Sequence, residues 1–477
     1  MYFERMQNSS FDAVLDQTLR FALDYLDGLE ERPVGATVDL VELRRRLVKE
    51  LNDEPMDAEA VVSDLVRDTA GGHLGSQGGR FFAWAIGGSV PAALAADWLT
   101  STWDQNAAVY SCSPAAAVVE EVAGEWIKQV LHLPELASFA LVSGCQMAHA
   151  VCLAAARHDL LARRGWDVEQ QGLSGSPRIT VFASNRHGSV ERAVRLLGLG
   201  EANVIDMPLD VNEQLTPEVL ESHFEGREGV PIILVLQAGD LNTGTFDRYQ
   251  ELIPIAKRHG AWVHVDGAFG LWVAASDKYR HLLAGFEAAD SWATDGHKWL
   301  NVPYDCGYAF VANGDAHTAA MSHRAPYMVH DSEARDQMDW NPEWSRRARG
   351  FATYAALRQL GLQGVADLVD RCCRHAADLV AGLGELPGVE VLWKPVINQG
   401  LVRFLDPANS SDEAANDRFT DLMSKRLVAH GEAFFINTTW RGRRAMRVSV
   451  MNWQTNERDV ARSIEAVRAC LQVGVGC

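Results

Sequence analysis

Ser291–Gly307 reads SWATDGHKWLNVPYDCG, and the lysine at its centre organises the rest of the chain. Lys298 lies between His297 and Trp299, and an apolar run lies on each side of it. An amine with few hydrated neighbours is destabilised in its charged form, so we expect the pKa of Lys298 to be lowered. Because the neutral amine is the form that attacks a carbonyl carbon, the sequence predicts a lysine that forms a Schiff base.

A second polar residue, Asp266, ends a short apolar run upstream of this lysine. Ala261–Gly270 reads AWVHVDGAFG, which predicts a buried strand followed by small residues. In a parallel sheet, side chains at the carboxyl ends of strands face the crevice in which ligands bind. Pyridoxal 5'-phosphate (PLP) requires a carboxylate for its ring nitrogen and a lysine for its aldehyde, so the two residues together predict a PLP site.

These segments resemble the group II PLP-dependent amino-acid decarboxylases, which include the aromatic-L-amino-acid and glutamate decarboxylases. The motifs that carry the resemblance are HVDGAFG and DGHKWLNVPYDCG, and the similarity runs from about Phe81 to the C-terminus. It implies an α/β fold of PLP fold-type I, with a large domain around a mostly parallel seven-stranded sheet. The implied divisions are an N-terminal helical segment (residues 1–85), the large PLP-binding domain (86–352) and a small C-terminal α+β domain (353–477).

The hydrophobic pattern agrees with this architecture. Short apolar runs predict strands at residues 139–142, 179–183, 232–236, 261–265 and 308–311. Helical spacing between them predicts helices at residues 115–131, 145–164, 189–197 and 249–259. Strands separated by helices imply a mostly parallel sheet with both faces covered. After a predicted helix at 345–360, the C-terminal part mixes strands (389–393, 401–404, 433–437, 446–451) with helices (412–430 and from 456).

Composition limits the kinds of partner. A chain of 477 residues with 47% hydrophobic residues predicts two or three domains with a large core. The net charge of −19 argues against binding to nucleic acid or to an anionic membrane. Neither an uncharged apolar stretch of about 18 residues, as a transmembrane helix needs, nor a secretory signal is recognisable, so we expect a cytoplasmic protein. The eight cysteines have no zinc-ligand spacing, which predicts reduced thiols and no metal site.

The N-terminal segment carries an amphipathic helix. Apolar residues recur at three- and four-residue spacing between Phe11 and Leu26. Such a face packs either against its own domain or against another subunit. In the resembling family, helices of this kind lie across the partner subunit, so the resemblance implies a homodimer.

The phosphate of PLP is expected at a turn between a predicted strand and a predicted helix. Gly144, Cys145 and Gln146 lie there, and the free N–H groups at the start of a helix attract an anion. The resemblance places the phosphate turn at these residues and makes His297 a second phosphate contact. Asp295 departs from the family, in which many members carry asparagine. A carboxylate repels a phosphate, so we expect Asp295 to point away or to bond through a protonated neighbour.

Two further residues are expected at the faces of the cofactor ring. His187 follows a predicted strand, where a histidine commonly caps the next helix. Its HGSVERA context resembles the family motif whose imidazole stacks on the ring. Ala268, two residues after Asp266, is the small contact that the resemblance implies on the other face.

Tyr327 carries the expectation about the reaction type. It lies in a long polar segment, residues 324–342, without helical or strand periodicity, which is typical of a lid or binding loop. Its PYMVH context resembles the family's mobile loop, whose tyrosine protonates the substrate Cα after CO2 is lost. Family members with phenylalanine there tend toward aldehyde formation, so the tyrosine favours simple decarboxylation.

The resemblance thus implies decarboxylation of an L-amino acid to its amine, with Lys298, Asp266, His187 and Tyr327 as catalytic residues. An aminotransferase or an aldehyde synthase on the same scaffold is the nearest alternative. Arg447 supports the aminotransferase, because an arginine in this part of that fold commonly holds the substrate carboxylate. A PLP-free regulatory homologue is a third reading.

The substrate is only weakly indicated. Phe81, Phe82 and Trp84 lie in the segment that lines the family's side-chain pocket, which favours an aromatic substrate. Arg80, beside them, leaves open a decarboxylase for acidic amino acids, and a decarboxylase for diamino acids is a further alternative.

Overall fold

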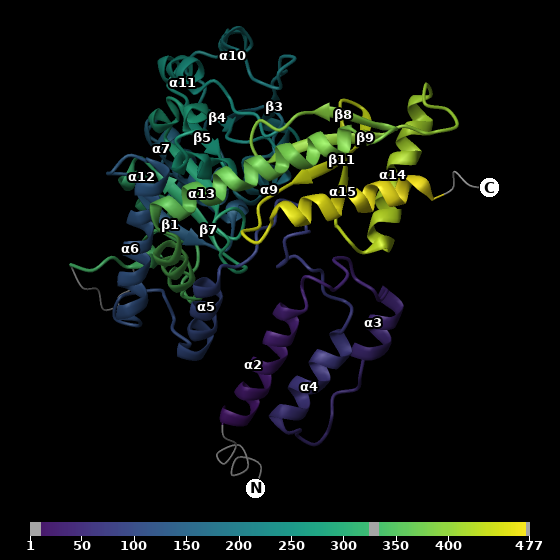
Figure 1. Cartoon of the computed structure of the whole chain (residues 1–477). Coiled ribbons are helices and arrows are strands. Elements are labelled where there is room, and N and C mark those ends of the chain that lie inside the picture. Colours follow the sequence, from purple (N-terminus) through teal and green to yellow (C-terminus); the bar gives the residue numbers. More distant parts are fainter. Residues whose placement is uncertain (1–10, 324–332, 474–477) are drawn as a thin grey trace.

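The structure is a computed structural model that describes residues 11–323 and 333–473 of the chain. Its larger sheet has seven strands in the order β1-β7-β6-β5-β4-β2-β3 (Figure 1). In that order they span Ser138–Val142, Gly307–Val311, Ser291–Asp295, Trp262–Asp266, Ile232–Gln237, Thr180–Ala183 and Val204–Asp206. β7 runs antiparallel to both of its neighbours, β1 and β6, and the other four strand pairs are parallel. The mostly parallel seven-stranded sheet expected from the sequence is therefore confirmed.

Both faces of this sheet are buried because its strands are apolar on both sides. Ile233 and Val235 belong to the cluster that packs on α7 (Cys145–Ala162) and α9 (Gly188–Leu196). The alternate residues of β4 belong to a second cluster on the opposite face, as the two-residue period of a strand requires. That face is covered by α6 (Pro114–Leu131) and the first part of α13.

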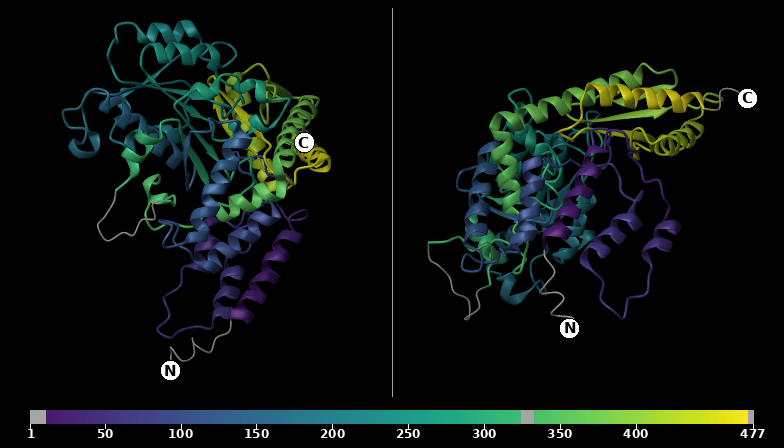
Figure 2. Two further views of the ribbon diagram at one scale, coloured as in Figure 1. Left: turned by 90° about the vertical axis from the view of Figure 1, so that its left-hand side faces the viewer. Right: turned by 60° about the horizontal axis from the view of Figure 1, so that its bottom comes forward.

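The helix α13 (Gly350–Gly384) connects the two parts of the molecule, with a non-helical break at Gly361. It leads to a four-stranded antiparallel sheet in the order β10-β11-β9-β8. These strands span Ile436–Trp440, Arg443–Ser449, Gln399–Phe404 and Val389–Trp393. With α14 (Glu413–His430) and α15 (Glu457–Gln472) they form the expected α+β arrangement, and Figure 2 shows α13 and α15 side by side over the sheet.

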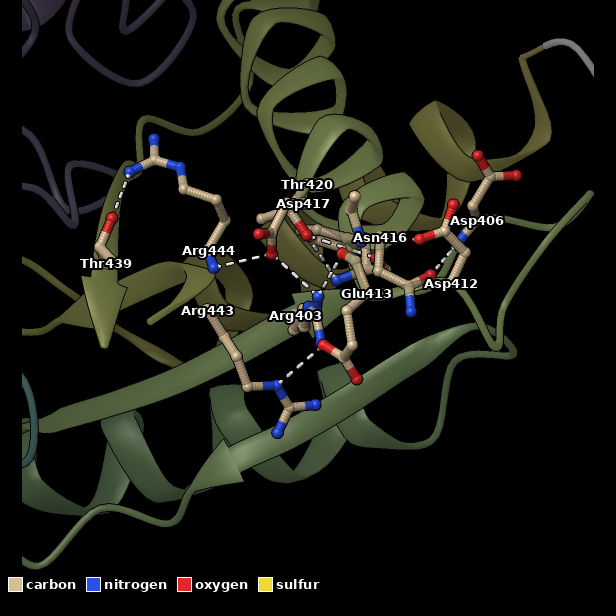
Figure 3. A network of polar contacts seen from close by, with 12 residues as sticks. Arg403, Asp406, Asp412, Glu413, Asn416, Asp417, Thr420, Thr439, Arg443 and Arg444 are labelled. Atoms are coloured by element: carbon tan, nitrogen blue, oxygen red, sulfur yellow. Dashed lines mark hydrogen bonds and ion pairs between the residues drawn. The ribbon is translucent and has the colours of Figure 1, made fainter. Parts of the chain in front are cut away.

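A charge network holds α14 on the small sheet (Figure 3). The Arg403 side chain is fully buried and binds the Glu413 carboxylate, the Glu413 carbonyl (2.8 Å) and Asp417 (2.8 Å). Asp417 also accepts a hydrogen bond of 2.9 Å from the Arg444 N–H. Because Glu413 and Asp417 remain partly exposed, they stay hydrated while they neutralise the buried guanidinium.

The N-terminal helices project from the rest of the molecule in all views (Figures 1 and 2). They are α2 (Phe11–Asp27), α3 (Leu40–Leu47) and α4 (Ala58–Thr69), followed by α5 (Pro91–Trp103) on the main body. The predicted amphipathic helix is present as α2; none of its residues is buried, and Phe11, Leu15, Leu19 and Leu23 are exposed. Within the described ranges, no helix is long and apolar enough to cross a lipid bilayer. The domain boundaries at residues 85 and 352 stay a prediction.

Candidate active site

A cavity of about 600 Å³ lies between the large and the small sheet, beside the carboxyl ends of β5 and β6. The large domain contributes residues predicted from the sequence, namely Gly144, Cys145, Gln146, His187, Ala268, His297 and Lys298. The small domain contributes the start of β10 and Arg447 of β11. Asp266 ends β5 next to this wall, is 4% exposed, and accepts a hydrogen bond of 3.2 Å from the Ala268 N–H. Residues far apart in sequence thus meet at one place.

The Lys298 side chain is 17% exposed, and its Nζ lies 3.2 Å from Asp295 Oδ2. Burial lowers the pKa of Lys298, as expected, but the nearby carboxylates, chiefly Asp295, outweigh burial and raise the pKa above its ordinary value. The predicted lowering of this pKa is therefore wrong for the cofactor-free protein. The sequence shows the apolar neighbours of Lys298, but it does not show that the Asp295 carboxylate lies against the Lys298 amine in the folded chain.

Asn301 fixes the segment that carries Lys298. Its φ of 56° lies in the left-handed region, which asparagine tolerates better than most residues. Its side chain accepts hydrogen bonds from the Gly88 N–H (2.8 Å) and the Trp453 N–H (3.0 Å). It also donates to the carbonyl of Met451 (2.9 Å). Three separate parts of the chain are joined here, and the sequence analysis missed this residue; an asparagine just after the HKW motif was the available signal.

Asp295 faces the predicted phosphate turn and does not point away from it. Its Oδ1 accepts a hydrogen bond of 2.6 Å from the Cys145 N–H at the start of α7. His297 Nε2 lies 3.5 Å from the same oxygen. Because His297 Nδ1 accepts from the Cys306 N–H (3.1 Å), the neutral ring carries its proton on Nε2, toward the turn. Burial lowers the pKa of His297 and favours this neutral form.

The turn leaves room for a ligand only because residue 144 is glycine. A Cβ at Gly144 would lie 3.1 Å from His297 Cε1, inside the space between the turn and the imidazole. The N-terminus of the 18-residue α7 opens toward this space. A carboxylate already uses one N–H of this anion site, so the site suits a phosphate that shares a proton with Asp295.

His187 both caps a helix and lines the cavity. Its Nδ1 accepts a hydrogen bond from the Ser189 N–H (3.2 Å) at the start of α9 and lies 2.8 Å from Ser189 Oγ. Burial lowers its pKa, so the ring is neutral. The capping bonds hold the imidazole in the cavity wall, and the two expectations for this residue are compatible.

The residues expected in a side-chain pocket are separated by the fold. Trp84 lines the cavity. Phe81 and Phe82 are buried behind the cavity wall, where they stack on Phe434 and Phe435 at centroid distances of 5.2 Å and 5.1 Å.

Arg80 is committed elsewhere. Its guanidinium binds the carbonyl oxygens of Leu29 and Glu30 in the N-terminal segment and that of Glu432 in the small domain. It also lies 3.2 Å from the Glu432 carboxylate. Arg80 therefore joins two parts of the scaffold, and it is not an unpaired cation waiting for an acidic substrate.

Arg447 is the cation that does face the cavity. It is 5% exposed, and its Nε has no hydrogen-bond partner in the described part of the chain. Burial lowers its pKa to about 10, partly opposed by Asp240, so it is still charged at neutral pH. Tyr327 lies outside the described residues.

These groups fit PLP on chemical grounds. The cavity offers an amine for the aldehyde, a buried carboxylate beside it for a protonated ring nitrogen, and a helix N-terminus for a phosphate. Lys298, Asp266 and the turn at Gly144–Gln146 would hold these three parts of the cofactor.

Comparison with known proteins gives a consistent result. The model of the pyridoxal-dependent decarboxylase conserved domain matches residues 41–405. The aromatic-L-amino-acid decarboxylase of Bacillus atrophaeus is 24% identical over 463 residues, which cover 95% of this chain and 94% of that protein. The phenylacetaldehyde synthase of Petunia hybrida is 24% identical over 445 residues, covering 90% and 88%. The crystal structure of Oryza sativa TDC with PLP and tryptamine superposes with a TM-score of 0.90 at 23% identity, covering 97% and 98%, and has the same fold.

Proposed function

Because this chain belongs to the pyridoxal-dependent decarboxylase family and is a PLP-dependent enzyme, we propose that it converts an aromatic L-amino acid to the corresponding amine and CO2. The observation that carries the proposal is the cavity that gathers Lys298, His187 and the α7 turn beside the buried Asp266. Trp84 on the cavity wall and the engagement of Arg80 elsewhere favour an aromatic over an acidic substrate.

Each residue has a defined task in this proposal. Lys298 would bind the cofactor aldehyde until the substrate amine displaces it, and binding would require the Lys298 ammonium group to lose its proton first. The carboxylate of Asp266 would keep the ring nitrogen protonated. His187 would pack against the ring from the cavity wall. When bound, PLP accepts the electron pair that CO2 leaves behind on Cα.

Asp295 provides a route for the proton of Lys298. Its Oδ2 lies 3.2 Å from the amine, and its Oδ1 lies at the phosphate turn. A carboxylate in contact with the amine can accept the proton that Lys298 must lose before its amine becomes nucleophilic.

Tyr327 remains our proposed donor of the proton to Cα. If the donor is absent, the electron pair on Cα is exposed to dioxygen, and the products become aldehyde, ammonia and hydrogen peroxide. We expect Tyr327→Phe to shift the product from amine to aldehyde in air. Product analysis under air and under nitrogen tests this, and amine formation at the wild-type rate would assign the proton to His187 or to water.

Arg447 favours a second candidate, an aminotransferase. A buried cation that faces the cavity suits the α-carboxylate of a substrate, and a firm ionic grip opposes loss of that carboxylate as neutral CO2. Transamination needs a keto acid as the acceptor of the amino group. Addition of 2-oxoglutarate would therefore stimulate product formation in an aminotransferase and leave a decarboxylase unaffected.

The direct test is a substrate panel. The PLP-loaded protein is incubated with tryptophan, tyrosine and phenylalanine, and with glutamate and 2,4-diaminobutyrate as acidic and diamino comparisons. CO2 and amine released in equal amounts from the aromatic substrates support the proposal. A keto acid product without CO2 would replace it with the aminotransferase.

We also propose that the enzyme is a homodimer. The exposed apolar residues of α2 recur every four positions and so share one face; they are Phe11, Leu15, Leu19 and Leu23. A stripe of this kind on a projecting element suits a second copy of the chain. We expect Leu15→Glu to convert the dimer to monomer in sedimentation, and an unchanged sedimentation coefficient would reject this interface.

A further inference from the structure

A series of buried polar side chains runs from Asp266 into the core, and the steps above do not use it. His149 Nε2 lies 3.5 Å from Asp266 Oδ2. On its other side, His149 Nδ1 lies 2.9 Å from His264 Nε2. His264 Nδ1 lies 2.9 Å from Ser291 Oγ, and this oxygen accepts a hydrogen bond of 2.9 Å from Trp262 Nε1. The two imidazoles and the serine have no exposed surface.

The pleat of the sheet builds this series. His264 precedes Asp266 by two residues on β5, so both side chains lie on the same face of the strand. Ser291 is the register partner of His264 on β6. His149 comes from the α7 helix that covers this face, one turn after Cys145.

The direction of the hydrogen bonds follows from the carboxylate. His149 Nε2 lies between Asp266 Oδ2 (3.5 Å) and Cys145 Sγ (3.4 Å); a lone pair there would face the carboxylate oxygen, whereas a proton is attracted to both neighbours. With the proton on Nε2, His149 Nδ1 must accept, so His264 Nε2 donates to it. His264 Nδ1 then accepts from the Ser291 hydroxyl, and Ser291 Oγ accepts from the Trp262 indole. Every donor in the series therefore points toward Asp266.

We propose that His149, held in one tautomer by His264 and Ser291, is a positioning residue that keeps the Asp266 carboxylate ionised and oriented toward the ring nitrogen of the cofactor. A neutral N–H donor stabilises the carboxylate without supplying a positive charge that would compete with the protonated ring. Without this donor, a carboxylate that is 4% exposed takes the proton from the ring nitrogen, and the ion pair becomes a neutral pair. This inference rests on the proposed role of Asp266 in the decarboxylase.

The ionisation of the two histidines agrees with this geometry. Burial lowers the pKa of His149 to about 3 and that of His264 to about 3, so both rings are neutral at neutral pH. Cys145, His149 and Asp266 place possible metal-ligand atoms within 4.8 Å of one another. Burial raises the pKa of the Cys145 thiol well above its ordinary value, which opposes the thiolate that a metal would need.

The first test needs neither cofactor nor turnover. Protein labelled with ¹⁵N-histidine reports the tautomer of each ring by nitrogen chemical shift, and His149→Leu and His264→Leu assign the two signals. We expect both rings to be neutral with the proton on Nε2. A proton on Nδ1 of His149, or an imidazolium at neutral pH, would overturn the proposal and leave the decarboxylase assignment standing.

The second test follows the cofactor itself. Protein loaded with PLP that carries ¹⁵N in its ring reports whether the ring nitrogen is protonated. We expect a pyridinium-type shift in the wild type, a move toward the neutral pyridine shift in His149→Leu, and partial recovery in His149→Gln, whose amide retains a donor. An unchanged shift in a folded His149→Leu protein would reject the proposal.

A matched control separates this effect from general disturbance of the core. His317 is also fully buried with a pKa lowered to about 3, but it bonds to Ser138 Oγ and the Trp340 carbonyl. We expect His317→Leu to leave the ring-nitrogen shift unchanged. An equal shift in this variant would make His149 merely structural. If His149→Leu does not fold, His149→Gln takes its place in the assignment, and the tautomer of the wild-type protein decides the question.

Discussion

Two arginines of the small domain illustrate how differently one residue type is used. Arg403 is fully buried, and its terminal nitrogens hold Glu413 and Asp417 (Figure 3). Arg447, on the adjacent strand β11, lines the cavity, and Asp240 is its nearby opposite charge in the described part of the chain. Lys298 also faces the cavity, from the other domain, but its amine is paired with the Asp295 carboxylate. Charges that are matched within the protein serve its stability, whereas charges left at a cavity serve a ligand and cost stability until it binds.

The largest effect that distinguishes the cavity from the Arg403 network is expected at Lys298. Lys298→Ala removes the only group proposed to hold the cofactor covalently, so turnover should fall by about a thousandfold or more. The fold should survive, because the ion pair of the Lys298 amine is local and joins it to Asp295, three residues earlier in the same segment. Amine formation and thermal unfolding are measured together. Substantial turnover in this variant would contradict the claim that Lys298 serves the cofactor whereas the Arg403 network serves stability.

A smaller loss of activity is expected at Asp266. Asp266→Asn keeps the size of the side chain and removes the charge that holds the ring nitrogen protonated, so turnover should fall by about 100- to 1000-fold. The free energy of unfolding of the cofactor-free protein should be unchanged or higher, because a buried carboxylate is removed. Turnover and urea unfolding are the measurements. Near-normal turnover with tightly bound PLP would show that another group protonates the ring.

As the pH falls, the buried histidines of the large domain should reduce its stability at a higher pH than the one at which the Arg403 network of the small domain is lost. Burial lowers the pKa of His149, His264 and His317 from 6.5 to about 3, so the unfolded chain takes up protons first as the pH falls. These three histidines do not reduce the free energy of unfolding above pH 6.5, and they reduce it progressively as the pH falls from 6.5 to about 3. Each histidine contributes a slope of about 1.4 kcal/mol per pH unit in this window.

The small domain follows a different pH window. The hydrogen bond from Arg403 lowers the pKa of Glu413 below its ordinary 4.5, so its contribution is present above that pH and is lost only as the pH falls further. Urea unfolding of wild type and His317→Leu between pH 5 and pH 7 measures the difference. The free energy of unfolding of the variant should depend less steeply on pH than that of the wild type, by the contribution of one histidine. Equal slopes would contradict the assignment of a neutral buried His317.

The smallest effect is expected at the Arg403 network itself. Arg403→Met should lower the free energy of unfolding by only about 1 kcal/mol, because the Glu413 and Asp417 carboxylates it leaves are partly hydrated. Asp417→Ala should cost more, since it leaves the buried guanidinium with fewer partners. Both variants should keep wild-type turnover when loaded with PLP. A large loss of turnover in either one would connect this network to the cavity.

The parts of this structure that were predictable from sequence are local. The apolar run before Asp266, the small turn at Gly144 and the helix behind it all follow from hydrophobic pattern and turn chemistry, and the structure has them. The strand that carries Asp295 was missed, because Ser291 and Thr294 are polar, although both are fully buried. The helices α4 and α5 and the short edge strand β3 were missed as well.

What the sequence could not reveal depends on distant contacts. The carboxylate of Asp295 reverses the expected direction of the Lys298 pKa, and this depends on side-chain placement within a tight turn. His149 and His264 are 115 positions apart and meet only when α7 packs on the sheet. Arg80 looked available for a substrate until the structure placed it among backbone carbonyls. Patterns of neighbouring residues predict helices and strands, but they do not predict which side chains distant in sequence come into contact.

The central claim is that one lysine, Lys298, holds the cofactor in the cavity between the two domains. Borohydride reduction of the PLP-loaded protein fixes the cofactor to whichever lysine holds it, and mass spectrometry of the digested protein identifies the peptide. We predict that the cofactor is found on Lys298 alone and is lost from that peptide when an aromatic amino acid is added before reduction. Attachment to any other lysine would contradict the account of the site.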